Sequence, residues 1–123
     1  MGEQEKSKID YFKNIIAVAY ADGKLDQIEK EFLIEKAQDL NIPIENVDHL
    51  IEEVKEMSRI IPVEDYDREE QLADAIATAV LDGDITDDEI KVCMEIGEAL
   101  GFDEKYINFL IENSLNLWKK FRS

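Results

Sequence analysis

The chain has 123 residues, a length that suits one domain with its own hydrophobic core. Apolar residues make up 45% of it, a share that argues against disorder. The formal net charge of −16 argues against nucleic-acid binding through phosphates, since that mode needs a clustered basic surface. A lone cysteine, Cys93, and the absence of any apolar run of roughly 18 residues favour a soluble cytoplasmic protein without disulfides.

Apolar residues recur at helical spacing from the beginning of the chain. A first helix is expected over about 7–21, ending at Asp22-Gly23, because glycine readily adopts the left-handed conformation that closes a helix. Asp26, with Glu29 three residues later, has the pattern of a capping box and opens a second helix.

A third helix is expected after Pro43, and the two halves of the chain separate at residues 60–65, where Pro62 cannot continue a helix. The inward face of this third helix is predicted to carry Val47, Leu50, Ile51, Val54 and Met57.

The second half repeats this plan sixty residues later. A fourth helix ends at Asp82-Gly83, Thr86 with Glu89 forms a capping box that opens a fifth helix, and Asp103 caps a long sixth helix. The residues predicted to face inward on these three helices are Leu72, Ala73, Ile76, Ala77 and Val80, then Ile90, Cys93, Met94, Gly97 and Leu100, and finally Ile107, Leu110, Ile111, Leu115, Trp118 and Phe121.

The string A-x-x-D-G-x-[Leu/Ile]-x-x-x-E therefore occurs twice, at one fixed offset and without a gap. We expect an all-α fold: a compact bundle of six to seven helices built from a duplicated helix-turn-helix unit. The repeat covers about 9–60 and 66–121, and residues 1–123 form a single domain.

The repeated string also matches the second half of a calcium-binding helix–loop–helix, with Asp22 and Glu29 in one copy and Asp82 and Glu89 in the other. The first half of that loop is missing, because calcium needs six to eight oxygen ligands and side chains of other kinds stand in their places. These are Val18 and Tyr20 in the first copy, and Thr78 and Val80 in the second.

Two interpretations of the four carboxylates stay open. In the first, each pair binds magnesium or low-affinity calcium, completed by water or by neighbouring acids, and the second pair (Asp82 and Glu89) is the richer in such neighbours. In the second, each motif is a helix-ending glycine followed by a capping box, with a purely structural role. No catalytic residue is predicted, since no arrangement of serine, cysteine or histidine typical of nucleophilic catalysis is present in the sequence.

These motifs resemble the TerB family, the tellurite-resistance-associated helical domain that also occurs inside DjlA co-chaperones. The resemblance covers about residues 9–115 and rests on the triplet at 21–23 with Glu29 and on the triplet at 81–83 with Glu89. It implies an all-α domain of about seven short helices with a role in stress response and tellurite resistance. It also implies metal binding by the acidic residue pairs, and action beside membrane-associated Ter proteins.

The expected function is that of a non-enzymatic, TerB-like module that binds divalent cations at its acidic corners and acts through a protein partner. The alternatives are a purely structural adaptor or co-chaperone-type interaction domain, and an acidic mimic of DNA.

Overall fold

The computed structural model describes residues 2–21, 23–56, 67–81 and 83–122, and this part of the chain is entirely helical apart from its turns. The prediction of an all-α fold with six to seven helices is confirmed, while the predicted break at 60–65 and Met57 lie outside the described residues. The elements are α1 (Gly2–Ala19), α2 (Gln27–Asp39), the short 3-10 helix η1 (Ile44–Asn46), α3 (Val47–Glu56), α4 (Arg68–Ala79), α5 (Asp87–Ala99) and α6 (Glu104–Arg122).

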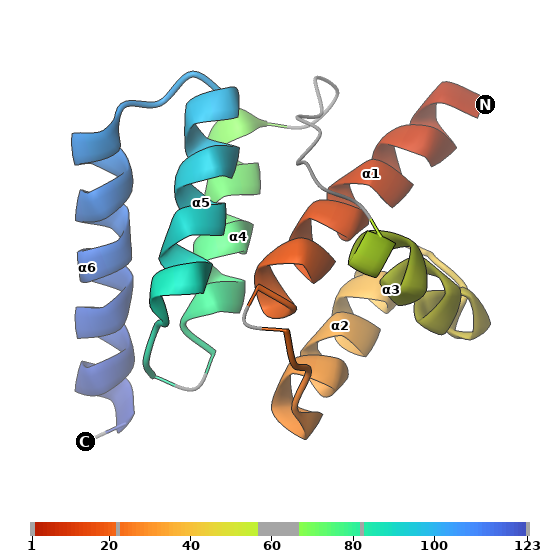
Figure 1. The fold of residues 1–123 in the computed structure, drawn as a ribbon, viewed down its shortest axis with the longest axis horizontal. Helices are drawn as coiled ribbons and strands as arrows, with labels where there is room; N and C mark the ends of the chain where they lie inside the picture. The colour runs from red at the N-terminus through yellow and green to blue at the C-terminus, as the bar shows by residue number, and fades with distance from the viewer. Residues whose placement is uncertain (1, 22, 57–66, 82, 123) are drawn as a thin grey trace.

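Helices α1 and α4 pack against each other at the centre of the molecule (Figure 1). α2 and α3 pack on α1, whereas α5 and α6 pack on α4, and α1 also contacts α5. α6 lies at one edge of the bundle, with α5 and α4 next to it, and α2 and α3 lie at the opposite side (Figure 1).

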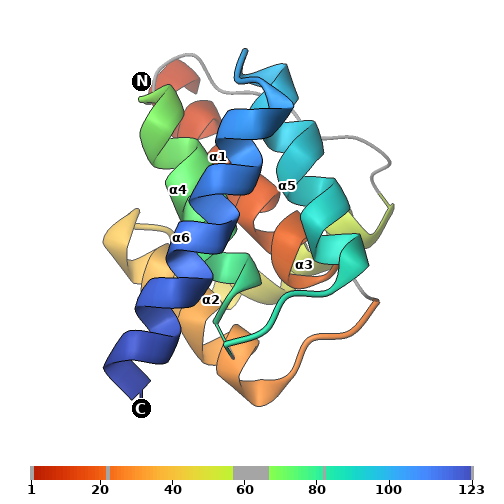
Figure 2. The same ribbon diagram turned by 90° about the vertical axis from the view of Figure 1, so that its left-hand side faces the viewer.

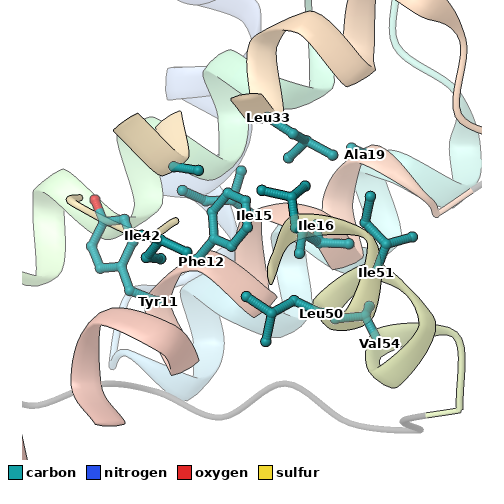
Figure 3. Close-up of a cluster of buried hydrophobic side chains, with 12 residues drawn as sticks. Tyr11, Phe12, Ile15, Ile16, Ala19, Leu33, Ile42, Leu50, Ile51 and Val54 are labelled. Carbon is teal, nitrogen blue, oxygen red and sulfur yellow. The ribbon is translucent and has the colours of Figure 1, made fainter. Parts of the chain in front are cut away.

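Each half of the chain supplies its own hydrophobic cluster. In the first, Phe12 and Ile16 of α1 pack between Leu33 of α2 and the apolar face of α3 (Figure 3). The second is built from α4, α5 and α6. One buried residue crosses between them, since Val18 of α1 packs into the second cluster. The remaining members of the second cluster are Leu72, Ala75, Ile76, Ala79, Cys93, Ile96, Leu100, Ile107 and Ile111.

The two halves share a local backbone plan. α2 and α5 have the same length and begin sixty residues apart, and Gly23 and Gly83 at the preceding corners both have φ +84°. Each of these helices also ends at a left-handed residue, Asn41 (φ 58°) in the first half and Gly101 (φ 95°) in the second. The halves differ in their last helix, because α3 has 10 residues and α6 has 19. An origin by duplication stays a prediction.

A polar network joins three helices around Asp74 of α4. The Tyr11 hydroxyl of α1 donates a hydrogen bond to one carboxylate oxygen, and Lys36 Nζ of α2 lies 3.3 Å from the other. The Thr78 hydroxyl donates to the Asp74 carbonyl oxygen at 2.7 Å. Helices α1 and α2 of the first half are therefore joined to α4 by polar contacts, in addition to the packing of α1 on α4.

The predicted inward face of α4 is partly wrong. Ala73 and Ala77 are exposed, whereas Ala75 and Ala79 are buried. Because α4 packs against α1, α5 and α6, its buried surface extends around the helix to these two alanines, leaving the opposite face to solvent. Small residues on both faces of α4 left its orientation undetermined by the sequence pattern.

Candidate functional site at the two helix corners

Glu29 and Glu89, two of the four predicted metal ligands, each belong to a complete capping box. The Glu29 N–H donates to Asp26 Oδ1 at 2.8 Å, and the Asp26 N–H donates back to Glu29 Oε1 at 3.1 Å. At the second corner the Glu89 N–H donates to Thr86 Oγ1 at 3.1 Å, and the Thr86 N–H donates to Glu89 Oε1 at 2.9 Å. Both predicted capping boxes are confirmed, so one oxygen of each glutamate holds the beginning of its own helix.

The other two predicted ligands, Asp22 and Asp82, lie outside the described residues, so the pairing of each aspartate with its glutamate stays a prediction. Within the described ranges, no three side chains of histidine, cysteine, aspartate or glutamate are grouped so as to hold a metal ion.

The corners differ in what covers them. A Cβ atom built on Gly23 would meet nothing within 4 Å, whereas one built on Gly83 would overlap the six-membered ring of Trp118, lying 2.6 Å from Cε3. Trp118 therefore packs directly on the second corner from α6. Glu89 is correspondingly buried, at 7% exposure, while Glu29 is half-buried.

The corners also differ in charge. Asp84, Asp87 and Asp88 are all exposed around the second corner, and the Ile85 N–H donates to Asp84 Oδ1 at 2.9 Å. Asp87 and Asp88 lie in the first turn of α5, where the helix dipole favours negative charge. The residues at the corresponding positions of the first corner are Lys24, Gln27 and Ile28.

The lone cysteine and the lone histidine of the chain both have contacts typical of a structural role. Cys93 is buried, its thiol donates to the Ala75 carbonyl oxygen at 3.8 Å, and burial together with the negative charge of Glu89 raises its pKa to about 12. The thiol therefore stays protonated at neutral pH, as expected of a core residue. His49 is exposed on α3, where its Nε2 lies 3.3 Å from a carboxylate oxygen of Glu53.

Trp118 is the residue at the corners that sequence analysis missed. It was predicted as one member of the inward stripe of α6, and nothing in the helical spacing indicated that it reaches Gly83, 35 residues earlier in the chain. The one available signal was the length of α6, because only a helix much longer than α3 extends as far as the corner.

None of the helices in the described part of the chain combines the length and the apolar character that a membrane span requires. Comparison with protein-family models, with curated proteins and with solved structures gave no match. The resemblance to the TerB family therefore rests on the corner motifs.

Proposed function

We propose that the protein is a non-enzymatic, TerB-like stress-response module that acts by binding a basic segment of a protein partner at its second corner. The observation that carries the proposal is the exposure of Asp84, Asp87 and Asp88 around a corner that the Trp118 ring and the Glu89 capping box hold in place.

A fixed acidic corner suits recognition of a basic segment for two physical reasons. Asp87 and Asp88 are stabilised by the positive end of α5, so their charges are presented without a large cost in folding stability. Lysine or arginine side chains of a partner would then form charge-assisted hydrogen bonds with carboxylates that already have defined positions. The net charge of −16 would also accelerate the encounter with a basic partner.

The proposal retains divalent cations as ligands of the same corners. Asp82 with Glu89, and Asp22 with Glu29, are the carboxylate pairs that would hold the ion. Calcium or magnesium would need further oxygens, from water or from the partner, because the capping boxes already engage one oxygen of each glutamate.

The test of partner binding compares two triple variants in affinity capture from cell extract. Asp84, Asp87 and Asp88 are replaced by asparagine in the first, and the matched control carries Glu31→Gln, Glu35→Gln and Asp39→Asn on the exposed side of α2. We expect a basic protein to be captured by the wild type and the control but not by the corner variant, with all three proteins giving the same circular dichroism spectrum. Equal capture by all three would refute the corner as the binding surface.

The cation part is tested separately by calorimetric titration with calcium, magnesium, manganese and zinc. Wild type is compared with an Asp82→Ala/Glu89→Ala variant and an Asp22→Ala/Glu29→Ala variant. We expect the second corner to give the larger heat, because it has more neighbouring carboxylates. The absence of heat with every ion, or the same heat in all three proteins, would remove cation binding and leave partner binding to its own test.

A further inference from the structure

The two helix corners have the same backbone geometry. Gly23 and Gly83 both have φ +84°, and the N–H of each donates to the carbonyl oxygen three residues earlier, at 2.8 Å and 2.9 Å respectively. Each corner then leads through a complete capping box into a helix of 13 residues. A side chain that packs on one of these glycines would therefore fit in the same way on the other.

Only the second corner has such a side chain on it. The Trp118 ring lies against Gly83, with Cε3 2.6 Å from a built Cβ atom, whereas a Cβ atom built on Gly23 meets no atom of the described residues within 4 Å. Gly23 is accordingly exposed and Gly83 half-buried, and Glu29 is half-buried where Glu89 is 7% exposed. Figure 2 shows the C-terminal part of α6 beside the turn between α4 and α5, while the turn between α1 and α2 (orange) lies away from α6.

The different lengths of the last helices explain this contrast. With the offset of sixty residues, the end of α3 at Glu56 corresponds to position 116, and α6 continues for 122 − 116 = 6 further residues. Trp118, the one tryptophan of the chain, belongs to this extension. The residue sixty positions before it is Ser58, which lies outside the described residues and has no ring in its side chain. The first half therefore has no tryptophan of its own for its corner.

We propose that the first corner is a docking site for a tryptophan side chain of a protein partner, which lies on Gly23 as Trp118 lies on Gly83. The occupant is inferred from the molecule itself, because the second corner shows which side chain fits this backbone. Ile28, in the first turn of α2, is 54% exposed and offers the partner an apolar contact, whereas Asp88 stands at the corresponding place of the second corner. The first corner is thus suited to an aromatic ring, and it is separate from the acidic residues proposed to bind a basic segment.

Charge indicates that basic residues accompany this tryptophan. In the chain's own example, Trp118 is followed by Lys119 and Lys120, both of which are exposed. Residues 22–31, around the first corner, contain four acidic side chains against two lysines, so their formal charge is 2 − 4 = −2. A partner segment in which lysines follow the tryptophan therefore complements the first corner in shape and in charge.

The contact is expected to be weak, with the tryptophan supplying most of its affinity. An aromatic side chain buries about 150–250 Å², well below the roughly 1,600 Å² of a standard protein–protein interface. Tryptophan is also among the residues whose truncation costs an interface the most binding energy. A short peptide at high concentration is therefore a suitable probe, and removal of its ring is the decisive change.

Magnetic resonance titration of the isotope-labelled full chain with a synthetic peptide tests the proposal. The peptide has the sequence of residues 116–122, Asn-Leu-Trp-Lys-Lys-Phe-Arg, which contains the ring and both lysines. We expect a saturable change in the amide resonance of Gly23, and a dissociation constant at least about tenfold higher for the peptide with Trp118→Ala. No saturable change at Gly23, or equal affinity of the two peptides there, would overturn the proposal.

Two protein variants locate the contact. Gly23→Ala places a methyl group where the ring would lie and should abolish the response, read from the amide resonance of Ile28. The matched control is Asn41→Ala, because Asn41 also has a left-handed backbone (φ 58°) but follows the opposite end of α2. Binding retained in Gly23→Ala, or lost equally in the control, would contradict docking on Gly23.

The same titration distinguishes other occupants and the other corner. A Gly23 resonance that shifts with protein concentration in the absence of peptide would assign the corner to a second copy and overturn the proposal of a separate partner. The variant with asparagine in place of Asp84, Asp87 and Asp88 should respond at Gly23 as the wild type does, so failure of the second-corner proposal and failure of this one are distinguishable. Loss of the Gly23 response in that variant would place the peptide at the second corner and refute the first.

Discussion

Replacing Gly83 by alanine should destabilise the protein more than the same replacement of Gly23. Both glycines have φ +84°, so an alanine incurs the same left-handed backbone penalty at either corner. Only at Gly83 does the new methyl group meet another side chain, the ring of Trp118. The pair of variants therefore separates backbone strain from packing between α6 and the second corner.

The expected loss of unfolding free energy in each variant follows from the cost of backbone strain and the cost of displacing Trp118. The left-handed conformation costs an alanine about 1–2 kcal/mol, which is the whole effect expected for Gly23→Ala. Gly83→Ala adds the cost of displacing Trp118, about 1–3 kcal/mol as for other overpacked sites. Its free energy of unfolding should thus fall by roughly 2–5 kcal/mol, a large share of the roughly 5–15 kcal/mol of a typical domain.

Urea denaturation, monitored by fluorescence and by circular dichroism, measures the free energy of unfolding of both glycine variants. Trp118 is the one tryptophan in the chain, so its emission reports directly on the second corner. Gly83→Ala should shift the emission of the folded protein to longer wavelength as the ring becomes more exposed, and Gly23→Ala should leave it unchanged.

A third variant isolates the contact. In a Trp118→Ala background, Gly83→Ala should cost no more than Gly23→Ala, because the ring that the methyl group would displace is gone. Equal destabilisation by the two glycine variants in the wild-type background, with unchanged emission in both, would show that the ring does not pack on Gly83.

Three further predictions concern polar and ionisable groups. Asp74→Ala should lower the free energy of unfolding by about 1–3 kcal/mol in urea denaturation, because it leaves the Tyr11 hydroxyl without its acceptor, and adding Tyr11→Phe should recover part of that loss. The raised pKa and burial of Cys93 predict that a thiol reagent at pH 8 labels it only in denaturant; rapid labelling of the folded protein would contradict its place in the core. The hydrogen bond from Lys13 lowers the pKa of Glu53, so this pair contributes stability above the ordinary value of 4.5 that is lost as pH falls through the lowered pKa. Lys13→Met should remove that acid-side loss, an effect within about 1 kcal/mol because solvent screens the pair, and an unchanged pH dependence of unfolding would refute the pairing.

The local features of the corners were predictable from sequence because a few adjacent residues determine them. Both capping boxes depend on residues three apart, and the left-handed turns on a glycine at a fixed place, so each motif specifies its own geometry. Asp103 likewise caps α6 as predicted, accepting from the Tyr106 N–H at 2.8 Å.

Features that depend on how helices dock were not predictable. Trp118 covers Gly83 and Ile107 lies 2.7 Å from a Cβ built on Gly97, contacts that depend on the docking of α6 against distant parts of the chain. The inward face of α4 was assigned partly wrongly at Ala73 for the same reason, since a small apolar residue fits either side of a helix. The functional prediction was limited in a different way, because a capping glutamate and a metal-binding glutamate have the same sequence signature.

The place of Val18 in the second cluster has a consequence for how the chain folds. α1 is synthesised first, yet the other buried residues of the cluster that Val18 joins come from helices more than fifty positions later, and α1 contacts two of these helices, α4 and α5. A chain that stops after α3 would leave this side chain in water, and a fragment beginning at α4 would have a gap in its core. The two halves therefore should not melt separately, and we expect one cooperative unfolding transition for a molecule whose sequence contains two similar halves.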